Sequence, residues 1–120
     1  MILEDIKDKL LEIDDSVYYG MVHSEKKETL WNYIVFNRTT MKASNNKTGY
    51  TDGFIVHIVR EEWIPDGLAE DVIEKLTGKD GIDGMRLGSV EMKYTYVPKG
   101  NTDTVVEMLS IEFVKPRKKA

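Results

Sequence analysis

The side chains best suited to acid–base chemistry in this sequence are its two histidines, His23 and His57. Histidine titrates near neutral pH, so it is a common general base in hydrolases and isomerases. His57 lies in a β-forming run, and Glu112 is an acid that could pair with it. However, no serine stands in a Gly-x-Ser-x-Gly turn, and no set of nucleophile, base and orienting acid is visible. The pattern therefore favours a structural role for His57 over a catalytic one.

The segment KDGIDG, residues 79–84, is the one place where carboxylates at short spacing suggest a cation site. An EF-hand loop needs oxygen ligands at its first, third, fifth and twelfth positions. Here Asp83 comes three residues after Asp80, and no glutamate closes the loop. Aspartate and glycine also form turns without a metal. The chain has no cysteine, which excludes disulfides and thiolate ligands. We therefore predict no metal, no cofactor and no catalytic residue.

The distribution of charge argues against a nucleic-acid partner. The net charge is −4, and the last six residues carry four cations and no acid, so residues 1–114 alone carry −8. Phosphate binding needs a basic face, which such a body lacks. Tyr94 and Tyr96 could stack on bases, but no basic cluster flanks them, so we expect them to pack in the core. No apolar run approaches the ~20 residues that span a bilayer, so no membrane partner is predicted.

Hydrophobic periodicity predicts one α+β domain over residues 1–114, followed by a solvated basic tail over residues 115–120. We expect a mainly antiparallel five-stranded sheet with two helices packed on it, in the order α-β-β-β-α-β-β. One strand, 32–38, is apolar on both faces, which is typical of a strand covered on both sides. The expected helices are 2–13 and 67–77, and the expected strands are 17–22, 32–38, 54–60, a run that begins at Val90, and 104–115.

Between two of these strands lies a polar stretch, MKASNNKTGYTDG, residues 41–53. It has neither alternation nor a helical period, and only Met41, Ala43 and Tyr50 offer apolar surface to bury. Consecutive strands in a small domain are usually joined by about two to five residues. We therefore predict a loop of unusual length over residues 41–52. Loops of this length in small domains often have a functional role.

The order of these elements resembles the tail-completion and tail-terminator proteins of long-tailed bacteriophages, also called head–tail joining proteins. The resemblance rests on an N-terminal helix, on the strands VYYGMV and WNYIVFNR, and on the segment GYTDGFIVHIVREE that leads toward a second helix and a final hairpin. Its most specific parts are the pattern Y-x-D-G-F-x-V-x-I from Tyr50 to Ile58 and the aromatic-rich strand YIVF. These are patterns of strand entry and not a catalytic signature.

The resemblance implies a small α+β subunit without enzymatic activity. Such subunits form rings, typically hexameric, at the head-proximal end of the tail tube. The ring stops growth of the tube and offers a face to the head connector. It implies as partners other copies of the chain, which is expected to be a monomer before assembly, together with the tail-tube and connector proteins. It implies location in the virion, and in the host bacterial cytoplasm before assembly.

In this interpretation the polar stretch is an assembly loop that becomes ordered against neighbouring subunits. Polar side chains can bond a partner's backbone once water is excluded, and ordering on assembly is a common use of such segments. A hairpin tip without a role is the simpler alternative. The assembly loop is predicted to comprise Ser44, Asn45, Asn46, Lys47, Thr48, Gly49 and Tyr50.

Two other functions remain open at this point. One is a small ligand-binding or regulatory module with a pocket between the second helix and the sheet. The other is a hydrolase or isomerase that uses His57 with Glu112, which would require a deep pocket around the imidazole.

Overall fold

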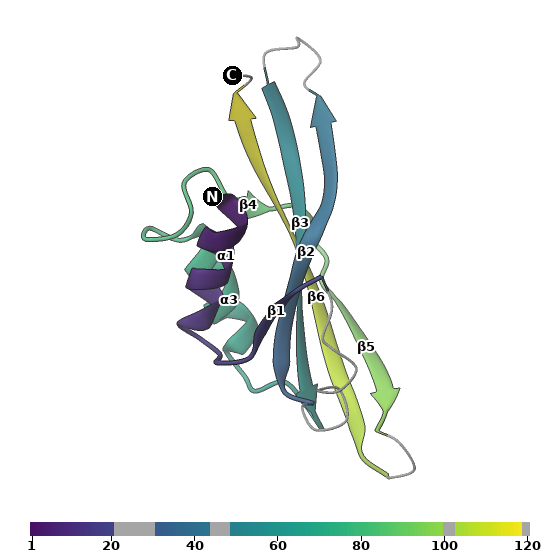
Figure 1. The fold of residues 1–120 in the computed structure, drawn as a ribbon. Helices are drawn as coiled ribbons and strands as arrows, with labels where there is room; N and C mark the ends of the chain where they lie inside the picture. The colour runs from purple at the N-terminus through teal and green to yellow at the C-terminus, as the bar shows by residue number, and fades with distance from the viewer. Residues whose placement is uncertain (21–30, 44–48, 100–102, 119–120) are drawn as a thin grey trace.

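The computed structural model describes residues 1–20, 31–43, 49–99 and 103–118. Within them, two helices lie against one face of a six-stranded sheet (Figure 1). In chain order the elements are α1 (Ile2–Leu11), β1 (Val17–Tyr19), β2 (Tyr33–Ala43), β3 (Gly49–Glu61), α3 (Leu68–Thr77), β4 (Arg86–Leu87), β5 (Lys93–Pro98) and β6 (Val105–Lys118).

The centre of the sheet is the antiparallel pair of β3 and β6, which runs in unbroken register from Gly49 opposite Lys118 to Glu61 opposite Val106. On one side, β2 pairs antiparallel with β3, and β1 lies parallel to β2 at the edge. On the other side, β6 carries both β4 and β5, each antiparallel to it. The strand order is therefore β1-β2-β3-β6-β4, with β5 also on β6.

The α+β architecture with two helices on one sheet agrees with the prediction from sequence. The sheet itself differs in two respects. It has six strands and not five, because the glycine-rich connection after α3 contributes the short strand β4. It is mixed, because β1 is parallel to β2. A strand of two residues has too few side chains to show a period, so the sequence pattern gave no sign of β4.

The hydrophobic core lies between the helices and the middle of the sheet. Alternation along the strands turns every second side chain toward the helices, and cross-strand partners share that face. Each helix contributes the residues of one apolar stripe. The central core residues are Ile6 and Leu10 of α1, Ile34 and Phe36 of β2, Phe54, Val56 and Ile58 of β3, Val72 and Leu76 of α3, and Leu109, Ile111 and Phe113 of β6.

The three longest strands continue well past the helices, and there the prediction of a loop over 41–52 is wrong. Residues 41–43 extend β2 and residues 49–52 begin β3, paired with each other from Met41 opposite Asp52 to Ala43 opposite Tyr50. A shift in register between Arg38 and Met41 marks a β-bulge. The stretch has no apolar alternation because it lies beyond α1 and α3, so the backbone ladder and not burial against these helices holds the strands together.

The predicted basic tail over 115–120 also needs correction. Residues 115–118 are the last four residues of β6 and pair with β3, while residues 119–120 lie outside the described residues. Lysine and arginine do not interrupt a strand whose side chains point into solvent. A tail and an exposed strand therefore look alike in sequence.

A partly buried ion pair ties the start of the chain to the sheet. Arg60 Nη2 lies 2.6 Å from Asp14 Oδ2, and both side chains are mostly shielded from solvent. Arg60 Nη1 also donates to the carbonyl oxygens of Tyr33 and Val59. Asp14 in turn accepts a hydrogen bond from the backbone N–H of Ser16, just before β1. The pair thereby fixes the connection from α1 to β1 against the end of β3.

We expect Ile111→Asp to unfold the domain. Ile111 is fully buried at the centre of β6, where an unpaired carboxylate costs several kcal/mol, comparable to the ~5–15 kcal/mol that holds a domain together. Glu112→Gln is the matched control, because Glu112 is the next residue, exposed on the other face, and should stay within about 0.5 kcal/mol of the parent. Chemical denaturation measures both. An Ile111→Asp chain as stable as the parent would place this face of β6 outside the core.

Candidate assembly surfaces

The predicted assembly loop falls into two parts in the structure. Ser44, Asn45, Asn46, Lys47 and Thr48 lie outside the described residues. Gly49 and Tyr50 are the first residues of β3, paired with both β2 and β6. The surface that the structure brings together here is the three-stranded ribbon beyond the helices. We call it the arm, residues 38–43, 49–53 and 115–118.

Arg117 joins the three strands of the arm. Its Nε donates to Asp52 Oδ2 at 2.6 Å, and its guanidinium lies 4.7 Å from the centre of the Tyr50 ring. Its Nη2 also approaches Met41 Sδ at 3.1 Å. A guanidinium can make an ion pair in its plane and a cation–π contact on its face at the same time. These contacts stiffen a ribbon that has no core beneath it.

The motif that carries the resemblance now has a structural explanation at each position. Tyr50 and Asp52 hold Arg117, and Phe54 opens the core row of β3. Gly53 lies against the β-bulge of β2, where a Cβ would stand 2.5 Å from Thr40 Oγ1 and 2.6 Å from Thr39 Oγ1. The motif therefore describes how the arm is joined to the core, which is a requirement of structure and not of catalysis.

Exposed aromatic side chains gather at the opposite end of the sheet. Tyr94 and Tyr96 of β5 are 55% and 58% exposed, and Trp63, after β3, is 67% exposed. The prediction that the two tyrosines pack in the core is wrong. They lie on the helix-bearing face, opposite Leu109 and Glu107, but all of β5 is exposed. Sequence alternation correctly placed the two tyrosines on one face of the strand. It could not show that no other described element packs on that face of β5.

Glu107 connects this aromatic patch to the chain that follows β3. Its Oε1 accepts a hydrogen bond from the backbone N–H of Ile64 at 2.8 Å. A hydrogen bond between Glu107 and the Tyr96 hydroxyl is the main cause that raises the pKa of Tyr96. The backbone of Glu62, next to Trp63, is left-handed with φ of 71°, a conformation that a residue with a Cβ adopts at a cost. Large, exposed tyrosine and tryptophan side chains are typical of binding surfaces.

His57 lies on the other face of the sheet, which carries neither α1 nor α3. Its Nδ1 is 2.8 Å from Ser110 Oγ on the neighbouring strand, a pairing that sequence spacing did not suggest. Glu112 lies on the same face but is opposite Ile55, two register positions further along the strands. Both residues lie between two neighbouring strands, so their own backbone N–H groups bond within the sheet and are not available to form an oxyanion hole. Among the described residues, the contact is a hydrogen bond that links two neighbouring strands.

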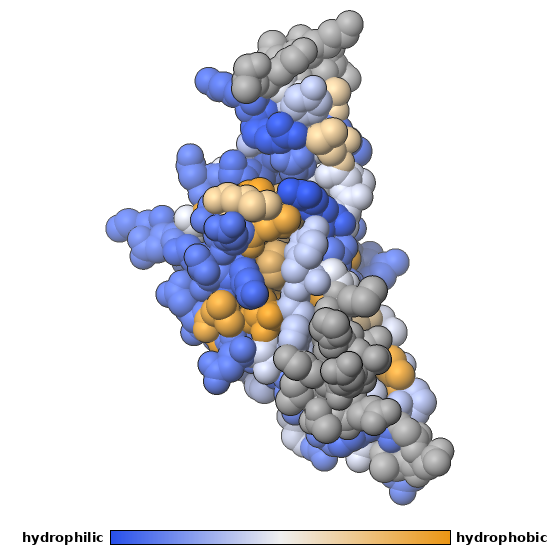
Figure 2. Space-filling view, in the orientation of Figure 1, coloured by the Kyte–Doolittle hydropathy of each residue, from blue (hydrophilic) through white to orange (hydrophobic). Residues whose placement is uncertain are grey.

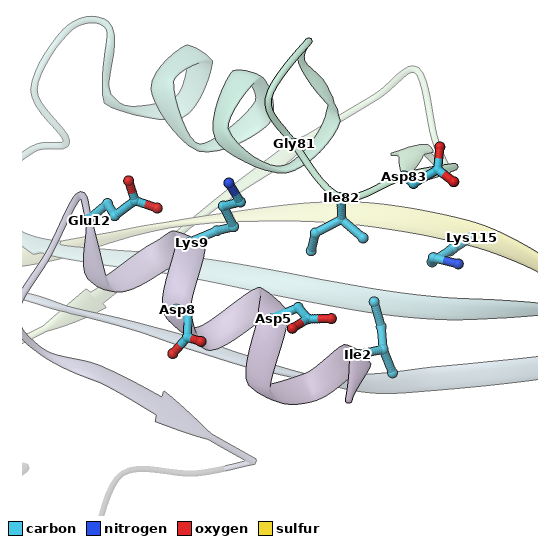
Figure 3. Close-up of a pocket in the computed structure, with 9 residues that line it drawn as sticks. All are labelled: Ile2, Asp5, Asp8, Lys9, Glu12, Gly81, Ile82, Asp83 and Lys115. Carbon is cyan, nitrogen blue, oxygen red and sulfur yellow. The ribbon is translucent and has the colours of Figure 1, made fainter.

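Four cavities lie open on the described part of the structure, and charged side chains are among the residues that line each of them. One hollow of about 640 Å³ lies between α1 and the connection that follows α3 (Figure 3). Ile82 points into it from the connection, and Asp5, Asp8, Lys9 and Asp83 are among its lining residues. Sites for small organic ligands are mostly apolar and enclose their ligand. No three metal-ligating side chains gather anywhere in the described ranges, and no helix there is long and apolar enough to cross a membrane.

Comparison with known proteins gives one finding about the fold. No protein-family model matches the chain, and no curated protein matches it either. Among solved structures, a chain in the virion of a native gene transfer agent (GTA) particle matches 97% of this chain and 93% of its own length. The TM-score is 0.57 and the sequence identity is 14%. This chain is therefore similar in fold, over nearly its whole length, to a component of a virion.

We expect Gly53→Ala to destabilise the protein by about 1–3 kcal/mol, because the added methyl group overlaps the two threonine hydroxyls of the bulge. In a Thr39→Ala/Thr40→Ala background the same change should cost much less. A double-mutant cycle by chemical denaturation measures the difference. Equal costs in the two backgrounds would show that the hydroxyls do not limit the space at Gly53.

We expect His57 to make the protein less stable as the pH falls. Burial lowers the pKa of His57 in the folded chain, whereas the unfolded chain keeps a pKa of about 6.5. The unfolded chain therefore binds the proton more readily, and stability declines from about pH 6.5 down to the folded pKa. His57→Gln removes this titration. Urea unfolding across this pH range measures the difference in unfolding free energy between parent and variant. His23 is present in both chains, so its titration does not contribute to this difference. A difference independent of pH would contradict the burial.

Proposed function

We propose that this protein is a non-enzymatic structural subunit of a phage-like virion, and more specifically that it completes the tail. In this proposal it forms a ring, hexameric by the resemblance in sequence, at the head-proximal end of the tail tube. The ring stops growth of the tube and joins it to the head connector. Its location is the virion, after a period in the host cytoplasm.

The observation that carries the proposal is the shared fold with a chain of a gene transfer agent virion, a phage-like particle, over 97% of one chain and 93% of the other. The agreement therefore concerns the fold of the whole given sequence and not a part of it. The finer assignment, to completion of the tail, comes from the order of elements and from the motif between Tyr50 and Ile58.

The surfaces of the described residues support an assembly role. The sheet extends past its helices at one end as the arm and exposes aromatic side chains at the other, so each end offers a different contact. Subunits of a ring need two such unlike patches, because each copy contacts its neighbours head to tail. A ligand-binding module and a hydrolase have less support, since the hollow in Figure 3 is open and charged and His57 has no catalytic surroundings.

The decisive experiment measures the mass of the purified protein alone and in the presence of assembled tail tubes. We expect a monomer by itself and a ring of about six copies at one end of each tube, visible by negative-stain electron microscopy. Tubes grown with the protein should have a defined length, and tubes grown without it should not. No association with tubes at micromolar concentration, together with unchanged tube length, would refute the assignment to tail completion.

A further inference from the structure

The arm is a ribbon with two open edges. β1 pairs with β2 only from Ile34 to Phe36, so within the described residues the outer edge of β2 has no neighbour from Asn37 onward. β4 reaches no further along β6 than Val114, so residues 115–118 also have an open outer edge. Figure 1 shows these strand ends projecting beyond α1 and α3. An open ribbon of this kind is a ready contact for another chain.

The arm is strongly basic. It carries five cations and one acid. Arg117 is paired with the acid, Asp52. Among the described residues the side chains of the other four cations make no ion pair and no hydrogen bond. These four are Arg38, Lys42, Lys115 and Lys118.

The helices and the connection after them carry the opposite charge. We call residues 2–12 and 68–83 the helix layer; it holds nine acids and four bases, and all nine acids are exposed. Figure 2 shows hydrophilic side chains over much of this side of the molecule. Glu4, Asp8 and Glu12 follow one another at intervals of four along α1, so they repel each other on one face. Within the described ranges Glu12 is the one acid of the nine that has an ion pair, with Lys75.

We infer that, in the ring, the basic arm of one copy lies on the acidic helix layer of the next copy. The inference rests on the proposed function, because it names the contact by which that ring is built. Two arms repel each other, and so do two helix layers, so the attractive contact joins unlike patches. A contact between unlike patches is heterologous and repeats around a ring.

The dimensions of the two surfaces agree. The six residues 38–43 extend over ~20 Å at ~3.3 Å per residue, whereas Glu4 and Glu12 are separated by ~12 Å along α1 at ~1.5 Å per residue. One arm is therefore long enough to cover the acidic row of a neighbouring α1. Lys115, at the base of the arm, lines the hollow beside α1 of its own copy. The strand ends beyond it project past both helices (Figure 1), where they are free to reach a neighbour.

The test reverses charge on each surface and then on both. The arm-reversed chain carries Lys42→Glu and Lys118→Glu, and the layer-reversed chain carries Glu4→Lys and Asp8→Lys. All four positions are exposed and make no side-chain ion pair among the described residues, so each chain should fold, which circular dichroism and thermal melting check. A neutral version with Lys42→Gln and Lys118→Gln serves if the arm-reversed chain fails to fold.

We expect each singly reversed chain to need about tenfold or more protein for half-maximal ring formation on tail tubes, since like charges then face each other. The chain with all four substitutions should form rings as the parent does. An equimolar mixture of the arm-reversed and layer-reversed chains should also form rings, because each supplies the surface that the other lacks. Mass and electron microscopy give the readout.

The outcomes separate this contact from the proposed function. If the parent forms the ring and the reversed chains form it equally well, the contact is refuted and the function stands. If the parent forms no ring, the proposed function fails before the reversed chains are compared. If the arm-reversed chain keeps the ring but loses binding to a labelled DNA duplex that the parent binds, the partner of the arm is nucleic acid and the inference is overturned.

Discussion

The thirteen-residue antiparallel pairing of β3 with β6 is the constraint on which the rest of the structure depends. Its middle third supplies core residues from both strands, Phe54 to Ile58 and Leu109 to Phe113, on which the two helices pack. Its two ends extend beyond the helices in opposite directions. Because the register is unbroken, the same pair of strands runs from the arm through the core to the aromatic patch. The orientation of each end is therefore set by its pairing in the core.

The two ends of the β3–β6 pair are stabilised in different ways. Backbone pairing and the contacts of Arg117 hold the arm, whose side chains are charged or small. At the other end Glu107 links β5 to the chain before α3, and Glu61 forms an ion pair with Lys99 across the sheet. Neither end buries enough apolar area to be stable by itself. Each depends on the central core, as expected of a small domain whose buried area is limited.

Sequence periodicity predicted the helices and strands that face the core, and it failed for the strands that extend beyond the core. The helices expected over 2–13 and 67–77 are α1 and α3, because their apolar stripes face the sheet. The loop expected over 41–52 is mostly strand, because alternation reports burial on one face and the arm has no buried face. For the same reason Tyr94 and Tyr96 alternate as core residues do and yet are exposed. In the candidate site, sequence patterns identify Tyr50 but place its partner Arg117 in a solvated tail. Such patterns report local periodicity, so they could not show that these two distant residues are in contact.

The position of β6 in the sheet has a consequence for synthesis of the protein. β6 is the last strand along the sequence, yet it is the strand that pairs with β3, β4 and β5. While the chain emerges from the ribosome at about 5–20 residues per second, β3 lacks one of its two partners, and β4 and β5 have no strand to pair with. The nascent chain therefore exposes Phe54, Val56 and Ile58 beside an open strand edge until β6 arrives. The core can therefore close only after β6 has been synthesised, and exposed apolar strands of this kind are prone to aggregate until then.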